Sequence, residues 1–274
     1  MYDIAVIGGG PAGLSAAIQA RARNKSVLVV SGDDRDNPLY KTSRIDNYLG
    51  FYNVTGPELL ERFRTHAGQM GVERRDGRVL NLLAVGGAYY LSIGSEVEQA
   101  RAVVLATGVV RAKKYPGEAE RLGAGVSYCA TCDGMLYRGK PVAVVGYTDT
   151  ARQEAEFLQK IGCSVTYFDR PKQCEIRGDG RVESVTCDGR TIPAEGVFIL
   201  RPTMAPTELF PGLAVEQGYV TVDRRMATNL PGLFAAGDCT GGPLQVSKAA
   251  GDGLIAGQSA AAWAAAQERR EKQS

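Results

Sequence analysis

Two cysteines and an acid lie close together near the middle of this 274-residue chain. The run Cys129-Ala130-Thr131-Cys132-Asp133-Gly134 spaces the cysteines so that, in a helical turn or a turn entering a helix, their sulfurs can reach bonding distance. A helix N-terminus nearby would lower a thiol pKa and favour the reactive thiolate. Asp133 could move a proton to or from the sulfur that leaves. The pattern favours a redox-active disulfide.

Half of a zinc site and a structural disulfide are the two alternative interpretations of this pair. Zinc in proteins usually takes four nitrogen or sulfur ligands in a recognisable spacing. The other cysteines form no second Cys-x-x-Cys pair, and His66 is the single histidine. We therefore predict no metal and give His66 no functional role. The four remaining cysteines are Cys163, Cys174, Cys187 and Cys239.

A nucleotide-binding pattern opens the chain. Residues 4–7 and 26–30 are apolar runs expected as strands, residues 14–23 are expected as a helix, and Gly-Gly-Gly-Pro-Ala-Gly stands between the first strand and the helix. In such a β-α-β unit Gly8 makes the tight turn, Gly10 admits a pyrophosphate and Gly13 lets helix and strand pack closely. Pro11 suits the first helical turn, whose N–H groups face the phosphates. This segment is predicted to bind a dinucleotide, although Ser31 replaces the usual ribose-binding acid.

Three later segments could line the same ligand. Ala106-Thr107-Gly108 follows an expected strand over residues 101–105, and its small residues let the backbone approach a ligand. Residues 32–55 are predicted as a long irregular segment that either contacts something flat or anchors a surface loop. Asp238 follows another strand and is either a helix N-cap or a partner for a cofactor hydroxyl. A helix is expected from about 244 to 267, with residues 268–272 as a frayed end.

Residues 141–169 repeat the first unit. The run Val142–Gly146 matches Ile4–Gly8, so the chain contains two dinucleotide-type units. In the second unit, Thr148 replaces the glycine that admits a pyrophosphate. Asp149, at the helix start, would cap the free N–H groups and repel a phosphate. Asp169 ends the second strand as an NAD-type acid would.

Composition bounds the class of protein. A hydrophobic content of 44% and a charged content of 23% are ordinary for a globular protein, and a net charge of +2 offers no argument for nucleic acid. The N-terminus lacks a secretory signal pattern, and no stretch approaches 18 apolar residues, so no membrane association is expected. Six cysteines do not make a disulfide scaffold in a chain of this size, and a cytoplasmic location is expected.

With these motifs in this order, the chain resembles the low-molecular-weight thioredoxin reductase family over nearly its whole length. The resemblance implies an α/β fold, namely the two-domain, Rossmann-like, three-layer ββα fold of flavoprotein disulfide reductases, with the second domain reduced in size. An FAD-binding domain is expected from residues 1–112 and 207–274. A smaller disulfide-bearing domain, a degenerate nucleotide-binding unit, is expected from residues 118–200, with linkers at 113–117 and 201–206.

The resemblance also implies the chemistry. Electrons would pass from FAD to Cys129–Cys132, and the dithiol would reduce thioredoxin by thiol exchange, with Asp133 as the third catalytic residue. Cys132, beside Asp133, is the expected sulfur on the flavin side, and a homodimer is expected. The expected FAD contacts are Gly8, Gly10, Pro11, Ala12, Gly13, Asn47, Ala106, Thr107, Gly108, Gly237, Asp238, Gln245 and Val246.

The departures from the family pattern lie in the second unit. The family's Gly-Gly-Gly-x-x-Ala becomes residues 146–151, its His-Arg-Arg becomes Asp169-Arg170-Pro171, and its closing glycine gives way to Leu200-Arg201. These changes resemble the ferredoxin-dependent, pyridine-nucleotide-independent branch, so ferredoxin is the expected electron donor. An acidic donor could be attracted by Lys113, Lys114, Arg121, Arg138 and Lys140. The alternatives are an NADPH- or NADH-dependent reductase and a non-catalytic flavin-binding redox sensor or partner-docking protein.

Overall fold

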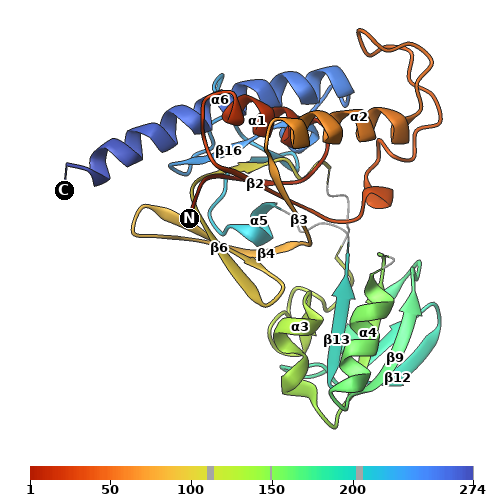
Figure 1. The fold of residues 1–274 in the computed structure, drawn as a ribbon. Helices are drawn as coiled ribbons and strands as arrows, with labels where there is room; N and C mark the ends of the chain where they lie inside the picture. The colour runs from red at the N-terminus through yellow and green to blue at the C-terminus, as the bar shows by residue number, and fades with distance from the viewer. Residues whose placement is uncertain (110–113, 149, 202–205, 274) are drawn as a thin grey trace. The chain divides into compact units, whose positions relative to one another are not determined.

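The computed structural model describes residues 1–109, 114–148, 150–201 and 206–273. The chain divides into two compact units, residues 1–110 with 203–274 and residues 111–202 (Figure 1). Each unit combines a mainly parallel sheet with helices, so the expected α/β fold class is confirmed. Residue 113 of the first predicted linker and residues 202–205 of the second lie outside the described residues, as does Asp149.

The larger unit is built on a seven-stranded sheet. The strands β3, β2, β1, β6 and β16 run parallel, whereas β5 and β4 extend β6 as an antiparallel arm. Ile7, Leu105 and Ala235 are register partners, so β1, β6 and β16 end at the same level. Across the sheet the strands are β3 (Glu73–Asp76), β2 (Val27–Ser31), β1 (Tyr2–Ile7), β6 (Glu96–Leu105), β5 (Ala88–Ile93) and β4 (Val79–Val85), with β16 (Leu233–Ala235) also on β6.

Two helices made of small residues share the core of this unit. Helices α1 (Pro11–Arg21) and α6 (Val246–Glu271) lie side by side (Figure 1). Added Cβ atoms at Gly253 and Gly257 would collide with backbone atoms of α1, so the two helices approach as closely as glycine allows. The remaining elements of the unit are η1 (Asp34–Asp36), α2 (Gly56–Gln69), α5 (Pro206–Leu209), β14 (Val215–Glu216), β15 (Tyr219–Val220) and η3 (Gly237–Thr240).

Helix α6 is longer than the sequence predicts. The expected frayed end is wrong, because the helix continues to Glu271. Glu268 forms an ion pair with Lys25 at 3.2 Å, and Glu271 forms one with Arg101 at 2.8 Å. These ion pairs join the last turns of α6 to Lys25, just before β2, and to Arg101 in β6. Among the described residues, no helix has both the length and the apolar character needed to cross a bilayer.

The smaller unit contains a four-stranded parallel sheet and a three-stranded antiparallel sheet. Val142 pairs with Val165 as Ile4 pairs with Val27, so the repeat seen in the sequence has a structural counterpart. The first sheet comprises β7 (Val126–Ser127), β13 (Gly196–Leu200), β8 (Pro141–Gly146) and β9 (Ser164–Asp169), and the second β10 (Cys174–Arg177), β11 (Ser184–Cys187) and β12 (Arg190–Pro193). Its helices are α3 (Ala130–Asp133), η2 (Gly134–Tyr137) and α4 (Ala151–Lys160).

Candidate active site and cofactor site

The two cysteines of the central motif are bonded to each other in the smaller unit. Cys129 stands at the N-cap of α3, Cys132 lies in its first turn, and the Cα atoms are 5.4 Å apart. The Cys129 Sγ accepts a hydrogen bond from the Cys132 N–H at 3.1 Å and lies 3.4 Å from the Thr131 hydroxyl. Hydrogen bonds to sulfur stabilise a thiolate once the disulfide is open. Cys129 is buried within this unit, whereas Cys132 is exposed.

A buried serine holds together the turn that contains Cys129, Cys132 and Asp133. The Ser127 Oγ donates to the Asp133 Oδ2 at 2.7 Å and accepts from the Cys129 N–H at 3.1 Å. Asp133 is therefore fixed beside the pair, at the end of α3. Sequence reasoning missed Ser127, whose single signal is its place two residues before Cys129.

An ion pair between the fully buried Glu118 and the partly buried Arg201 supports the residue that precedes the disulfide. Glu118 has no exposed surface, and its carboxylate accepts from Arg201 Nη2 at 2.7 Å and from the Tyr128 hydroxyl at 2.9 Å. Burial opposes the charge on Arg201, but the bond to Glu118 and its negative charge raise the pKa of the guanidinium overall. Because breaking a buried pair leaves an uncompensated charge, this contact holds Tyr128, next to Cys129, in place. Arg201, noted only as a departure from the family pattern, thus has a structural role.

Several of the residues expected to contact FAD lie where β1, β6 and β16 end. A Cβ on Gly8, whose φ is +118°, would collide with the Ala106 carbonyl, and one on Gly237 would lie 2.7 Å from the Ala12 Cβ. The Asn47 amide donates to the Gln245 Oε1 at 2.9 Å. Segments far apart in the chain therefore meet at the carboxyl edge of a parallel sheet, where ligands bind in open α/β folds.

The start of α1 suits an anionic ligand. Gly10 is its N-cap, no side chain caps it, and its first turn contains no acid. The first N–H groups of the helix, together with the helix dipole, therefore favour a phosphate. A Cβ on Gly10 would have a single neighbour, the Asn37 amide nitrogen at 3.4 Å, so the backbone in front of the turn is open.

Two buried side-chain oxygens lack a partner within the part of the chain that the structure describes, Thr107 Oγ1 and Asp238 Oδ1. Both belong to residues expected to contact FAD. Buried polar atoms are nearly always hydrogen-bonded, so a ligand with hydroxyl or amide groups fits here. The alternative that Asp238 is an N-cap is wrong, because Ala236 occupies the N-cap of η3.

Lys248 and Asp252 hold the loop that carries Asp238. The Lys248 ammonium donates to the carbonyls of Gly237 and Gly241 at 2.9 and 2.7 Å and lies 2.8 Å from the Asp252 Oδ2. The same Asp252 oxygen accepts from the Gly237 N–H at 3.1 Å. Burial raises the pKa of Asp238, and the Lys248 charge lowers it. Sequence reasoning missed this network, which shows only as an i,i+4 pair of opposite charges.

The remaining cysteines divide into a pair and two single thiols. Cys174 and Cys187 form a second disulfide, which the sequence analysis did not predict because 13 positions separate the two residues. Cys163 and Cys239 are free and buried. Burial raises the pKa of Cys239 to about 11, so its thiol is inert at neutral pH. Within the described residues, no three His, Cys, Asp or Glu side chains gather as a metal ion would require.

A nucleotide-type fold with a bonded Cys-x-x-Cys defines a disulfide oxidoreductase. The family described as pyridine nucleotide-disulphide oxidoreductase matches residues 2–177 and 170–253. This chain belongs to that family. Because its enzymes are flavoproteins, FAD is the cofactor of this chain, in agreement with the open turn and unpartnered oxygens described above.

Individual relatives show which members of the family this chain is similar to. A thioredoxin reductase of Listeria innocua is 34% identical, over 95% of this chain and 93% of the relative. A ferredoxin-flavin thioredoxin reductase from Clostridium acetobutylicum superposes with a TM-score of 0.91 and 39% identity, over 98% of this chain and 99% of that structure. A Lactococcus lactis thioredoxin reductase has a TM-score of 0.61 and 29% identity, over 97% and 100%. The resemblance to the thioredoxin reductase family is thereby confirmed.

The open space at Gly10 allows a sharp test of the cofactor site. Gly10→Val should reduce the FAD content of the purified protein by about tenfold or more, because a branched side chain would stand where the pyrophosphate approaches the backbone. The FAD-free protein should still fold, because a Cβ on Gly10 meets no backbone atom and only the Asn37 side chain, at 3.4 Å. Gly68→Ala on α2, where a Cβ meets nothing within 4 Å, is the control and should keep its FAD. Full FAD content in Gly10→Val would remove Gly10 from the site.

The Lys248 network yields a prediction for FAD affinity. Lys248→Met should raise the Kd of FAD by about tenfold or more, because the loop that positions Asp238 loses charge-assisted hydrogen bonds. Removing the cation raises the pKa of the Asp238 carboxyl, so any pH midpoint in FAD binding should move to higher pH. Fluorescence titration with FAD between pH 5 and 9 measures the Kd and the pH midpoint of FAD binding. Lys272→Met, at the exposed end of α6, should change neither, and an unchanged Kd in Lys248→Met would show that the loop holds its shape without this residue.

Proposed function

We propose that this chain is an FAD-dependent reductase of thioredoxin, that Cys129, Cys132 and Asp133 are its catalytic residues, and that reduced ferredoxin is its electron donor. The observation that carries the proposal is the bonded pair at the start of α3, in a chain whose relatives are named thioredoxin reductases. The proposed FAD contacts are the residues that meet at the ends of β1, β6 and β16. We further propose a cytoplasmic homodimer, on the strength of the family resemblance.

The residues of the smaller unit supply the thiol chemistry. When bound and reduced, FAD would supply the electron pair that opens the Cys129–Cys132 bond. Cys129, whose Sγ accepts the Cys132 N–H, then attacks the disulfide of thioredoxin as a thiolate and forms a mixed disulfide. Cys132 attacks Cys129 Sγ, which restores the pair and releases thioredoxin as a dithiol. Asp133, held by Ser127, moves the proton at the sulfur that leaves.

The second nucleotide-type unit supports a donor other than NADPH or NADH. A Cβ on Gly146 would collide with the Tyr167 hydroxyl, so this tyrosine fills the space at the end of β8. The Tyr147 hydroxyl donates to the Pro171 carbonyl at 2.9 Å and closes the loop over the turn after β9. Asp169 forms an ion pair with Arg152 at 2.9 Å instead of standing clear for a ribose. The protein's own side chains therefore occupy positions that a nicotinamide nucleotide would need.

Helices α1 and α4, which follow the first strand of their β-α-β units, differ in the charge of their first turns. Helix α1 has no acid in its first turn, whereas α4 has Glu154 there. An acid near a helix N-terminus competes with a bound phosphate. Each lost charge-assisted phosphate contact removes about 1.5–3 kcal/mol of binding free energy, so losing two or three weakens binding by roughly a hundredfold or more.

The basic patch expected to attract an acidic donor is weaker than the sequence suggested. Arg121 turns inward and donates to the Gly178 carbonyl at 2.6 Å, and Lys140 forms an ion pair with Glu195 at 3.4 Å. Lys113 lies outside the described residues. The donor proposal therefore rests on the filled nucleotide unit and on the ferredoxin-flavin relative, and not on this patch.

The roles of the two sulfurs can be separated by single substitutions. Cys129→Ser and Cys132→Ser should each keep their FAD and lose at least about 99% of thioredoxin reduction, because neither can re-form the disulfide. With Cys132 proposed on the flavin side, only Cys132→Ser should trap thioredoxin as a mixed disulfide on a non-reducing gel. Cys163→Ser is the control and should turn over normally. Trapping by Cys129→Ser alone would reverse the two roles, and normal turnover in both variants would make the pair structural.

The electron donor is decided by anaerobic turnover. Reduced ferredoxin should support thioredoxin reduction, whereas NADPH and NADH at the same concentration should bleach the bound flavin at least about a hundredfold more slowly. Stopped-flow absorbance of the flavin measures the first half-reaction, and insulin precipitation by thioredoxin measures the whole. Rapid bleaching by a nicotinamide with none by ferredoxin would return the chain to the NADPH or NADH class. No turnover with any donor would favour the redox sensor.

A further inference from the structure

A second disulfide lies in the smaller unit, outside the catalytic motif. Cys174 is the first residue of β10, Cys187 is the last residue of β11, and the two are direct partners across this antiparallel pair. Both residues are buried, at 5% and 1% exposure. The pair lies on the β10–β11 hairpin, apart from α3 and from Asp133, so we do not treat it as a substitute for Cys129–Cys132.

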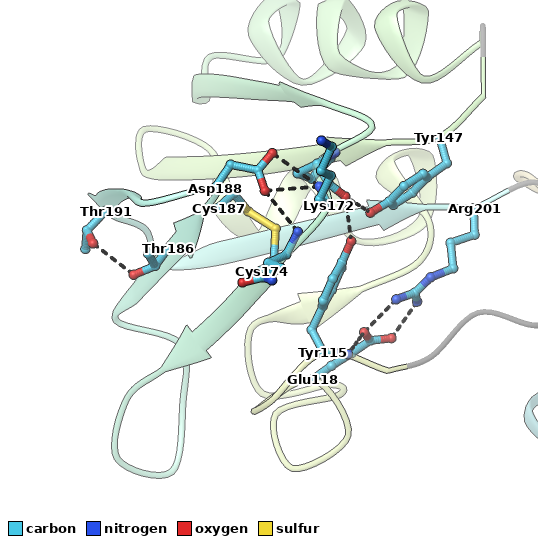
Figure 2. Close-up of a disulfide and its surroundings, with 12 residues drawn as sticks. Tyr115, Glu118, Tyr147, Lys172, Cys174, Thr186, Cys187, Asp188, Thr191 and Arg201 are labelled. Carbon is cyan, nitrogen blue, oxygen red and sulfur yellow. Dashed lines mark hydrogen bonds and ion pairs between the residues drawn. A yellow bond between two sulfur atoms is a disulfide. The ribbon is translucent and has the colours of Figure 1, made fainter.

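The residues on either side of this disulfide hold each other. Asp188, directly after Cys187, accepts the N–H groups of Lys172 and Gln173 on its carboxylate, at 3.1 and 3.0 Å. Its own N–H donates to the Gln173 carbonyl at 3.0 Å. Figure 2 shows the carboxylate of Asp188 facing this turn beside the two sulfurs. We call these three hydrogen bonds between Asp188 and residues 172–173 the Asp188 clasp.

The clasp fixes a carbonyl that two tyrosines use. Pro171, the residue before Lys172, accepts the Tyr147 hydroxyl at 2.9 Å and the Tyr115 hydroxyl at 3.4 Å (Figure 2). Tyr147 belongs to the loop after β8, the glycine loop of the degenerate nucleotide-type unit. The Arg201 guanidinium lies over the Tyr115 ring, 5.4 Å from its centre, and pairs with Glu118. One continuous set of contacts thus joins the second disulfide to the closed nucleotide loop.

The Cys174–Cys187 bond closes one end of the hydrogen-bonded ladder between β10 and β11. The cysteines are at the end of the β10–β11 pairing, and the ends of a ladder open more easily than its middle. Without a covalent bond there, the last pair and the adjoining clasp would open together. The exposed Thr186–Thr191 hydroxyl pair, at 2.9 Å on the β11–β12 side, is a separate contact between side chains of β11 and β12 and provides a comparison (Figure 2).

We propose that Cys174–Cys187 is a second redox site, which fastens the Asp188 clasp and so holds the nucleotide-type loop closed over Pro171, and which takes no part in thioredoxin reduction. A trialkylphosphine opens it: the S–S bond breaks, two thiols form with two electrons from the phosphine, and water supplies the two protons and the oxygen of the phosphine oxide. The opened state releases the turn at residues 170–173 and with it Tyr147.

Thiol counting tests whether the bond exists. The chain has six cysteines, of which four are in the two disulfides, so the oxidised protein should show two free thiols after unfolding, those of Cys163 and Cys239. Reduced thioredoxin, reacting in the reverse direction, should open Cys129–Cys132 and raise the count to four free thiols. A phosphine in denaturant should open both disulfides and raise the count to six. A non-reducing digest should contain a peptide pair linked through Cys174 and Cys187. Four free thiols in the oxidised protein, with no linked peptide, overturn the proposal.

Amide hydrogen exchange tests whether the bond fastens the clasp. In the double variant Cys174→Ser with Cys187→Ser, the Lys172 and Gln173 amides should exchange about tenfold faster or more, because they lose the Asp188 carboxylate as acceptor. Asp188→Asn should speed the same amides while keeping the disulfide. Thr186→Val, which removes only the hydroxyl pair, should leave them unchanged. FAD content and thioredoxin reduction should stay at the wild-type level in all three.

Two results would overturn the proposal that the Cys174–Cys187 bond fastens the Asp188 clasp and takes no part in thioredoxin reduction. Equal exchange at Lys172 and Gln173 in the wild type and the double variant refutes the proposed fastening, even if the disulfide is found. Where the double variant does not fold, the wild-type protein treated with phosphine is compared with the untreated protein at the same amides. Loss of thioredoxin reduction in the folded double variant would also overturn the assignment, since the bond would then belong to the catalytic cycle.

Discussion

Close approach of backbone to backbone at the ends of β1, β6 and β16 is the constraint on which the cofactor site depends. Gly8 lies against the Ala106 carbonyl, and Gly237 lies against Ala12, with no room for larger side chains. The three strands end in register, so the turns that follow them meet at one edge of the sheet. The same need for small residues extends to the α1–α6 contact, where glycines of α6 face the backbone of α1.

The two β-α-β units of the chain show how side chains decide what one backbone can bind. Both have the same strand register, with Ile4 opposite Val27 and Val142 opposite Val165. In the first, the turn at Gly10 is open and the helix start is free of acids. In the second, Thr148 stands in the place of Gly10, and the Tyr147 hydroxyl bonds the loop to the Pro171 carbonyl. A fold-level match to a nucleotide-binding family therefore does not by itself assign a nucleotide to each unit.

The disulfide chemistry depends on a polar framework behind the exposed cysteine. Ser127 joins Cys129 to Asp133, and the buried Glu118, paired with Arg201, anchors Tyr128 just before the motif. Buried pairs of this kind contribute little net stability but strongly resist displacement of either partner. They place a reactive turn on a rigid part of the smaller unit, while the exposure of Cys132 keeps one end of the disulfide accessible.

The sequence by itself determined the class of fold, the repeated nucleotide-type unit, the Cys129–Cys132 pair and the stretches that we propose line the FAD site, because each is a local pattern of glycines, apolar runs or spaced cysteines. Only the tertiary structure decided the contacts between distant positions. Cys174 meets Cys187 across a hairpin, Arg201 meets the buried Glu118, and Lys248 holds the loop of Asp238. Such pairs leave no periodic signal, since they depend on which strands and loops become neighbours after folding. The end of α6 was mispredicted for the same reason: its charged residues look disordered until Lys25 and Arg101 are brought beside them.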